Sequence, residues 1–154
     1  MNRSQKICRD LLIAYALLML WLLFGQRIGS GLWEAYPQRL AENFNLVPLS
    51  TLADFADTLR DGMNPALVRH AIINLAGNVV MFVPLGALLP GCFAWLRSFG
   101  RCMAVSAGIL CAVELIQLFT LLGVCDVDDL ILNLLGTATG FLLYAGMGKL
   151  RRGA

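Results

Sequence analysis

The sequence predicts an all-α, polytopic membrane protein: a four-helix transmembrane bundle with one short interfacial helix in its first extracytoplasmic loop. Of its 154 residues, 58% are hydrophobic and only 14% are charged, and the mean hydropathy is +0.72. A soluble domain carries about 25% charged residues, so this chain lacks the polar groups to cover a solvated surface. Four long apolar runs account for the excess. The composition excludes a soluble domain, a disordered chain and a collagen-like repeat, and the sequence carries no nucleic-acid-binding motif.

Each apolar run is long enough, or nearly so, to cross a membrane as a helix. About 30 Å of hydrocarbon requires roughly 20 residues at a rise of about 1.5 Å each. The predicted spans are residues 11–28, 71–93, 102–122 and 130–148, within a single domain over 1–154. The first run could instead be a signal peptide, but no small-residue cleavage site follows Phe24, so we expect it to be retained. The five cysteines show no CxxC spacing, which argues against a disulfide framework and favours small apolar packing residues.

Basic residues predict how the chain is oriented in the bacterial inner membrane. Lys and Arg close to helix ends remain on the cytoplasmic side. Eight of the twelve lie before the first run, between the second and third runs, or after the fourth: Arg3, Lys6, Arg9, Arg97, Arg101, Lys149, Arg151 and Arg152. The turn between the third and fourth runs holds three aspartates and no basic residue. Both termini are therefore predicted to be cytoplasmic, with the first loop and the aspartate turn outside.

The first loop contains one amphipathic segment, at residues 51–60. Leu52, Phe55 and Leu59 recur there at helical spacing, while Asp54 and Asp57 fall on the other side. We expect a short helix that lies in the headgroup region of the membrane. It either holds the loop at the membrane surface or acts as a lid over a site that opens outward.

Polar side chains interrupt three of the apolar runs at a common depth. Glu114 lies in the third run, roughly 18 Å from its cytoplasmic end, and Gln117 shares its helix face. An acidic group in hydrocarbon costs about 2.5 to 3.5 kcal/mol, so it has to pair, protonate or reach water. The outer halves of the second and fourth runs add Asn74, Asn78, Asp129 and Asn133. These groups either hold the helices together by hydrogen bonds or line a polar site.

Four carboxylates at one mouth of the bundle are more than helix packing requires. Glu114 is the candidate general acid or base, and Asp126, Asp128 and Asp129 are candidate catalytic residues that could hold a divalent cation. Like charges repel one another, so the cluster needs a cation, shared protons or a basic partner. Two candidate basic partners, Arg69 and His70, lie at the outer end of the second run. Together with the amide side chains they make up the candidate substrate-binding residues: Arg69, His70, Asn74, Asn78, Gln117 and Asn133.

Four sequence elements, in this order, resemble the VanZ-like family of small bacterial membrane proteins. They are NLVPL at 45–49, NLAGNVVMFVPLG at 74–86, Glu114 with Gln117, and DVDDLILN at 126–133 followed by Gly136 and Gly140. The resemblance implies a four-helix membrane protein linked to low-level resistance to glycopeptide antibiotics of the teicoplanin type. Many members carry a basic residue shortly before the aspartates, whereas residues 122–125 are uncharged here. The resemblance therefore implies another donor, such as Arg69.

Three functions are compatible with these residues. The leading hypothesis is an outward-facing polar pocket that binds or modifies the headgroup of an envelope lipid or of a lipid-linked precursor. One alternative is a non-catalytic protein whose outer loops mask envelope targets. The other is a small proton- or ion-coupled transporter in which Glu114 is the relay. Membrane lipids are the expected partners in each case.

Overall fold

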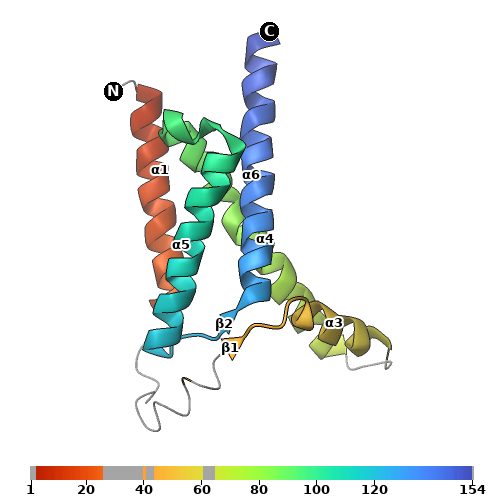
Figure 1. Ribbon diagram of the computed structural model, residues 1–154. Coiled ribbons are helices and arrows are strands. Elements are labelled where there is room, and N and C mark those ends of the chain that lie inside the picture. The colour runs from red at the N-terminus through yellow and green to blue at the C-terminus, as the bar shows by residue number, and fades with distance from the viewer. Residues whose placement is uncertain (1–2, 26–39, 41–43, 61–64, 154) are drawn as a thin grey trace.

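The computed structural model describes residues 3–25, 40, 44–60 and 65–153. These residues form α1 (Arg3–Leu20), a π-helical turn η1 (Trp21–Gly25), β1 (Phe44–Asn45), α3 (Ser50–Arg60), α4 (Pro65–Cys92), a 3-10 turn η2 (Ala94–Arg97), α5 (Phe99–Thr120), β2 (Cys125–Asp126) and α6 (Val127–Gly153). Figure 1 shows both termini at one end of the molecule and β1, β2 and α3 at the other.

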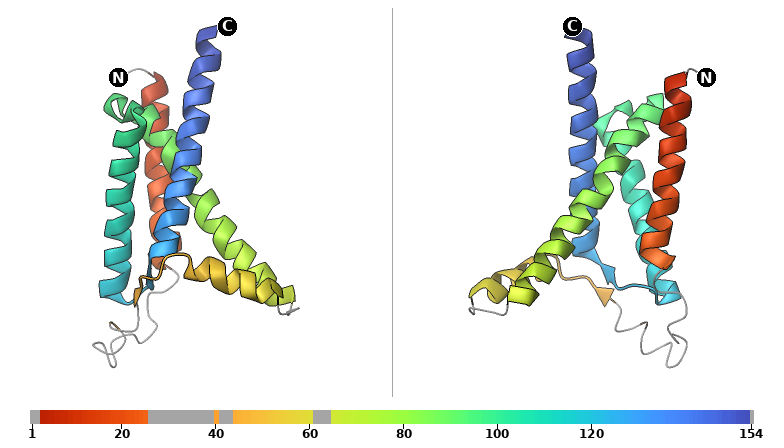
Figure 2. Two further views of the ribbon diagram at one scale, coloured as in Figure 1. Left: turned by 45° about the vertical axis from the view of Figure 1, so that its right-hand side comes forward. Right: turned by 180° about the vertical axis from the view of Figure 1, so that it is seen from behind.

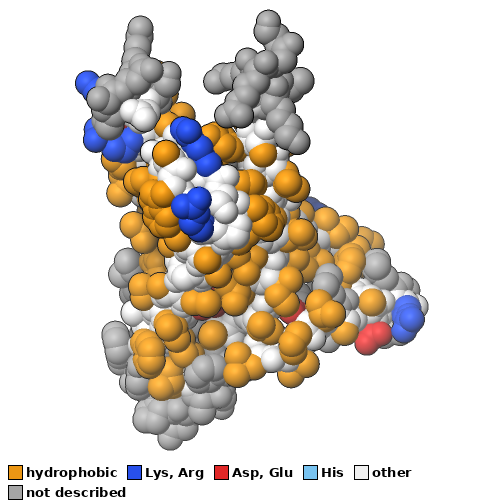
Figure 3. Space-filling model, turned by 45° about the horizontal axis from the view of Figure 1, so that its top comes forward, with side chains coloured by type: hydrophobic (Ala, Val, Ile, Leu, Met, Phe, Trp, Pro, Cys, Tyr) orange, Lys and Arg blue, Asp and Glu red, His pale blue; other side chains and the backbone are white. Residues whose placement is uncertain are grey.

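The four predicted spans are confirmed as helices long and apolar enough to cross a membrane. They cover Gln5–Gly25, Ile72–Cys92, Phe99–Thr120 and Val127–Gly148. Polar residues extend three of these helices beyond the apolar runs, because helix formation does not require hydrophobicity along the whole length. The face drawn in Figure 3 is mostly hydrophobic, with Lys and Arg side chains near the end that carries the termini. A surface of this kind suits a helix bundle surrounded by lipid.

Helices α4 and α6 cross at backbone contact, and glycines make the contact possible. A Cβ added at Gly136 would overlap the carbonyl oxygen of Val79, and one added at Gly140 would overlap that of Val83. From the α4 side of the same contact, a Cβ at Gly86 would overlap the carbonyl oxygen of Thr137 in α6. Small residues allow membrane helices to approach this closely, and the close approach lets Cα–H groups face carbonyl oxygens. The Gly136-x-x-x-Gly140 pattern is therefore a packing site between these two helices.

Helix α1 lies against α4 through polar contacts as well as apolar ones. The Tyr15 hydroxyl donates to the carbonyl oxygen of Met81 at 3.0 Å. Met81 lies three residues before Pro84, and α4 runs through both Pro84 and Pro90 as one helix. Because proline disturbs the hydrogen bonds of the preceding turn, an outside donor such as Tyr15 stabilises the backbone there.

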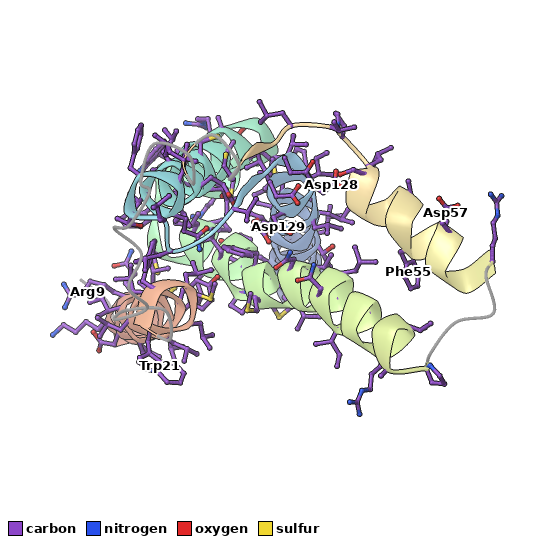
Figure 4. The ribbon with its side chains drawn as sticks, turned by 90° about the horizontal axis from the view of Figure 1, so that it is seen from below. Arg9, Trp21, Phe55, Asp57, Asp128 and Asp129 are labelled. Carbon is purple, nitrogen blue, oxygen red and sulfur yellow. The ribbon has the colours of Figure 1, made fainter. Side chains whose placement is uncertain are left out.

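The end of the molecule remote from the termini is closed by two short elements. Strands β1 and β2 pair in parallel, with Phe44 opposite Cys125 and Asn45 opposite Asp126. Helix α3, the predicted interfacial helix, follows β1 and runs across the direction of the spans (Figures 1 and 2). Figure 4 shows Phe55 on the side of α3 that faces α4 and Asp57 on the other side, as its amphipathic pattern predicts.

Candidate functional site

A buried carboxyl group lies between α5 and the turn before α6. Glu114, in α5, is only 8% exposed. Its Oε2 atom accepts a hydrogen bond from the backbone N–H of Asp126 at 3.4 Å. Glu114 therefore faces the aspartate motif from the inside of the bundle.

Asp126 begins α6 as its N-cap. Its Oδ1 atom accepts the backbone N–H of Asp128 at 2.8 Å, which satisfies a donor in the first turn of the helix. Its Oδ2 atom accepts Asn45 Nδ2 at 2.9 Å. Asn45 also donates to Ser50 Oγ at 2.9 Å, so one amide joins β1, α3 and the start of α6.

Asp128 holds the segment before α3 against α6. Its side chain is buried, and its Oδ1 atom accepts the backbone N–H of Leu49 at 2.5 Å. Leu49 has a left-handed backbone, with φ 65°, which turns the chain into α3. Asp128 and Asp129 both lie in the first turn of α6, where the helix dipole favours negative charge.

Asp129 and Asn133 lie one turn apart on α6, on the face that meets α4. Asn78 Nδ2 donates to Asp129 Oδ1 and so joins the two helices just beyond their glycine crossing. Asn133 is 6% exposed, and its Oδ1 atom is buried without a hydrogen-bond partner in the described part of the chain. A buried acceptor without a donor costs about 1–3 kcal/mol, so this oxygen calls for a donor from elsewhere.

The remaining candidate residues do not gather at one point. Gln117 is buried, but its Nε2 atom donates to the carbonyl oxygen of Leu23 at 3.4 Å and so holds η1 against α5. Asn74, one turn before Asn78, is exposed, because the first half of α4 leaves the bundle (Figures 1 and 2). The His70 side chain is outside the described residues. Two of the predicted substrate-binding amides, Asn78 and Asn133, thus lie with the carboxylates.

A sequence model of the family described as VanZ/LLP1 matches residues 12–148, which is most of the chain. The chain belongs to the VanZ/LLP1 family. The match covers Glu114, the aspartate motif and all three crossing glycines. No curated protein and no solved structure matches the chain.

In this VanZ/LLP1 protein, Arg69, the basic residue expected to face the aspartates, lies on the diverging part of α4 (Figure 2). Arg69 is exposed near the start of α4, at the splayed end of that helix. Neither ion pair formed by described residues involves it: Arg9 pairs with Asp10, and Arg60 with Asp57. The divergence of α4 carries the start of this helix away from the bundle, and a donor role for Arg69 stays a prediction.

The described residues do not gather the aspartates with other ligands into a cation site. Within residues 3–25, 40, 44–60 and 65–153, no group of three or more His, Cys, Asp or Glu side chains is placed to hold a metal ion. Asp126 and Asp128 instead accept hydrogen bonds from backbone N–H groups and from Asn45. Their role in the structure is to cap α6 and fix the loop, and sequence spacing alone does not separate this role from metal binding.

Cys125 adds a partly buried thiol to the same end. Burial raises the pKa of the Cys125 thiol, and the nearby Glu114 and Asp126 carboxylates raise it further.

Asn45, Leu49 and Ser50 also help to build the site, although the sequence analysis did not select them as site residues. Their role depends on the pairing of β1 with β2, which joins positions about 80 residues apart. The one sequence signal was the NLVPL element at 45–49, which includes Asn45 and Leu49.

Proposed function

We propose that this protein binds the headgroup of an envelope lipid, or of a lipid-linked precursor, at the polar end of α4, α5 and α6. The binding groups in this proposal are Glu114, Asn78, Asp129 and Asn133. Asp126 and Asp128 position them by fixing the start of α6. If a chemical step follows binding, Glu114 is the general acid or base.

The observation that carries this proposal is the unpartnered Asn133 Oδ1 atom. It is a buried acceptor one turn above Asp129, on the polar face of α6. An acceptor in this position is satisfied by a hydrogen-bond donor such as a hydroxyl or ammonium group, and many lipid headgroups carry one. Packing alone gives no reason to bury this oxygen without a donor.

The divergence of α4 supports access from the side. Its outer half leaves α6 beyond the Asn78–Asp129 hydrogen bond (Figures 1 and 2). Asn74 is exposed on this part of α4, and so are Ile72 and Ile73. In the proposed mode, acyl chains lie along the exposed apolar surface while the headgroup moves from Asn74 towards Asn78 and Asn133. A lipid then reaches the site from the membrane and not from water.

The test is lipid analysis of cells that lack the protein and of cells that express the wild type, Glu114→Gln, Asn133→Leu or Thr139→Val. Thr139 is the matched control, because its hydroxyl lies on the exposed side of the same helix and bonds only the preceding turn. We expect the wild type and Thr139→Val to change the same lipid species, and Glu114→Gln and Asn133→Leu to lose that change at equal protein level. We also expect any altered sensitivity to teicoplanin-type antibiotics to follow the lipid change.

The two alternative functions give different results in the same cells. A masking protein keeps its phenotype in Glu114→Gln and loses it when the loop between residues 33 and 69 is replaced. A transporter leaves the lipids unchanged and loses ion flux in vesicles when Glu114 becomes glutamine. A lipid change that persists in both Glu114→Gln and Asn133→Leu contradicts our proposal.

A further inference from the structure

The thiols of two cysteines meet at the end of the bundle that carries the termini. Cys8 is in the first half of α1, and Cys92 is the last residue of α4. Their Sγ atoms are 2.7 Å apart, although 84 positions separate the two residues in the sequence. We propose that Cys8 and Cys92 form a reversible disulfide that joins α1 to α4.

The surroundings of Cys8 hold its sulfur against the last turn of α4. Cys8 Sγ donates a weak hydrogen bond to the carbonyl oxygen of Leu88 at 3.6 Å. A Cβ added at Gly91 would be 3.0 Å from the same sulfur, so a larger residue at this position would crowd the Cys8 thiol. Both thiols are partly exposed, which leaves them accessible to small reagents.

The other three cysteines serve as internal controls. Cys102 is buried in α5, Cys111 is exposed on the same helix, and Cys125 is in β2 at the far end of the bundle. No thiol–thiol contact besides Cys8–Cys92 is formed among the described residues. Oxidation at low reagent concentration should therefore select this pair.

The oxidant in this reaction is a small-molecule disulfide. The thiolate of Cys8 or Cys92 attacks it, which forms a mixed disulfide and releases one small thiol. The second cysteine thiolate then attacks the protein sulfur of the mixed disulfide and releases the second small thiol. In total, two protein thiols become one disulfide, and the reagent is reduced to two thiols.

The link would act on the span with the least buried surface. Only 6% of the apolar window in Gln5–Gly25 is buried, against 22–33% in the other spans. Besides apolar packing, Tyr15 and the Gln117–Leu23 contact attach this span to its neighbours. A covalent bond at Cys8 would restrict its movement and stabilise the bundle against unfolding.

The experiment uses the purified full-length protein in detergent, with and without oxidised glutathione. After oxidation, the protein is denatured in SDS, alkylated with N-ethylmaleimide and weighed intact. We expect three alkylated cysteines in the oxidised wild type, five after reduction, and a linked peptide pair containing Cys8 and Cys92. In Cys111→Ser, two cysteines should still become protected from alkylation on oxidation. In Cys92→Ser, no cysteine should be protected by an internal disulfide.

Thermal unfolding provides the second measurement. Oxidation should raise the Tm of the wild type and of Cys111→Ser and leave that of Cys92→Ser unchanged. Gly91→Val, which crowds the Cys8 sulfur while keeping both thiols, should form the linked peptide at least fivefold more slowly. The proposal is overturned if Cys8 and Cys92 are alkylated or glutathionylated separately, or if either pairs with another cysteine.

Discussion

The two halves of α4 differ in how they meet the rest of the molecule. The half that contains Val79, Val83 and Gly86 touches α6 at backbone distance. The half that begins at Pro65 leaves the bundle, and its side chains at Ile72 and Ile73 are 50% and 61% exposed. Both halves are helical and apolar, so neither helix propensity nor hydrophobicity explains the difference.

Small residues explain where the two helices stay together. In a membrane, apolar side chains gain little by exchanging lipid contacts for protein contacts. Packing and hydrogen bonds therefore decide which helices associate. Glycines on both helices supply close packing at the crossing, and the Asn78–Asp129 hydrogen bond marks its outer limit. Beyond that point α4 is free to diverge, and the divergence exposes Asn74 beside the proposed site.

The largest effect is expected at the glycine crossing. Gly86→Ala, Gly136→Ala and Gly140→Ala each place a methyl group on a backbone carbonyl oxygen of the other helix, and we expect a loss of about 3 kcal/mol or more in stability. Gly77→Ala and Gly146→Ala are the matched controls, because a Cβ there meets nothing within 4 Å. Since alanine favours helix over glycine by up to about 1 kcal/mol, these controls should be neutral or stabilising. Thermal unfolding in detergent measures both the losses and the gains in stability. Equal losses of stability at all five positions would contradict the backbone contact at the crossing.

A smaller effect is expected at the outer limit of the crossing. Asn78→Leu removes the hydrogen bond to Asp129, and interhelical hydrogen bonds of this kind contribute about 0.6 to 1.7 kcal/mol. Asn74→Leu, one turn further out on the same helix, should leave the free energy of unfolding unchanged because Asn74 is exposed. Unfolding of the two variants in a denaturing detergent series provides the comparison. If Asn74→Leu lowers the free energy of unfolding as much as Asn78→Leu does, the contact between α4 and α6 does not end at Asn78.

The smallest effect is expected in the diverging half itself. Ile73→Ala shortens a side chain that faces away from the protein, so stability should change by less than about 0.5 kcal/mol. Leu85→Ala, in the packed half, removes a buried side chain and should cost about 2 kcal/mol or more. If both variants unfold at the same temperature as the wild type, the contrast between the two halves of α4 is lost.

The sequence was sufficient to predict the four spans and α3, because hydropathy and helical period are local properties. The same local signals placed Glu114, Asn78 and Asn133 on inward faces. They could not separate Asn74 from Asn78, since residues four apart share a face whether or not the neighbouring helix has diverged. The β1–β2 pair could also not be predicted from the sequence, because two-residue strands far apart in sequence leave no periodic pattern.

The aspartate motif shows a different limit. Carboxylates clustered in sequence suggest a metal site, yet Asp126 and Asp128 accept backbone N–H groups at a helix start. The choice between these roles depends on where their donors lie, and the Leu49 N–H and the Asn45 amide come from a distant segment. Only the three-dimensional arrangement supplies that information.

Both chain ends lie at the pole opposite Asn45 and Asp126 (Figure 1). An affinity handle or fluorescent protein attached to either end is therefore separated from the polar cluster by the length of a span. Single-molecule and pull-down assays can then immobilise the chain through such a fusion without obstructing the proposed lipid entry between α4 and α6.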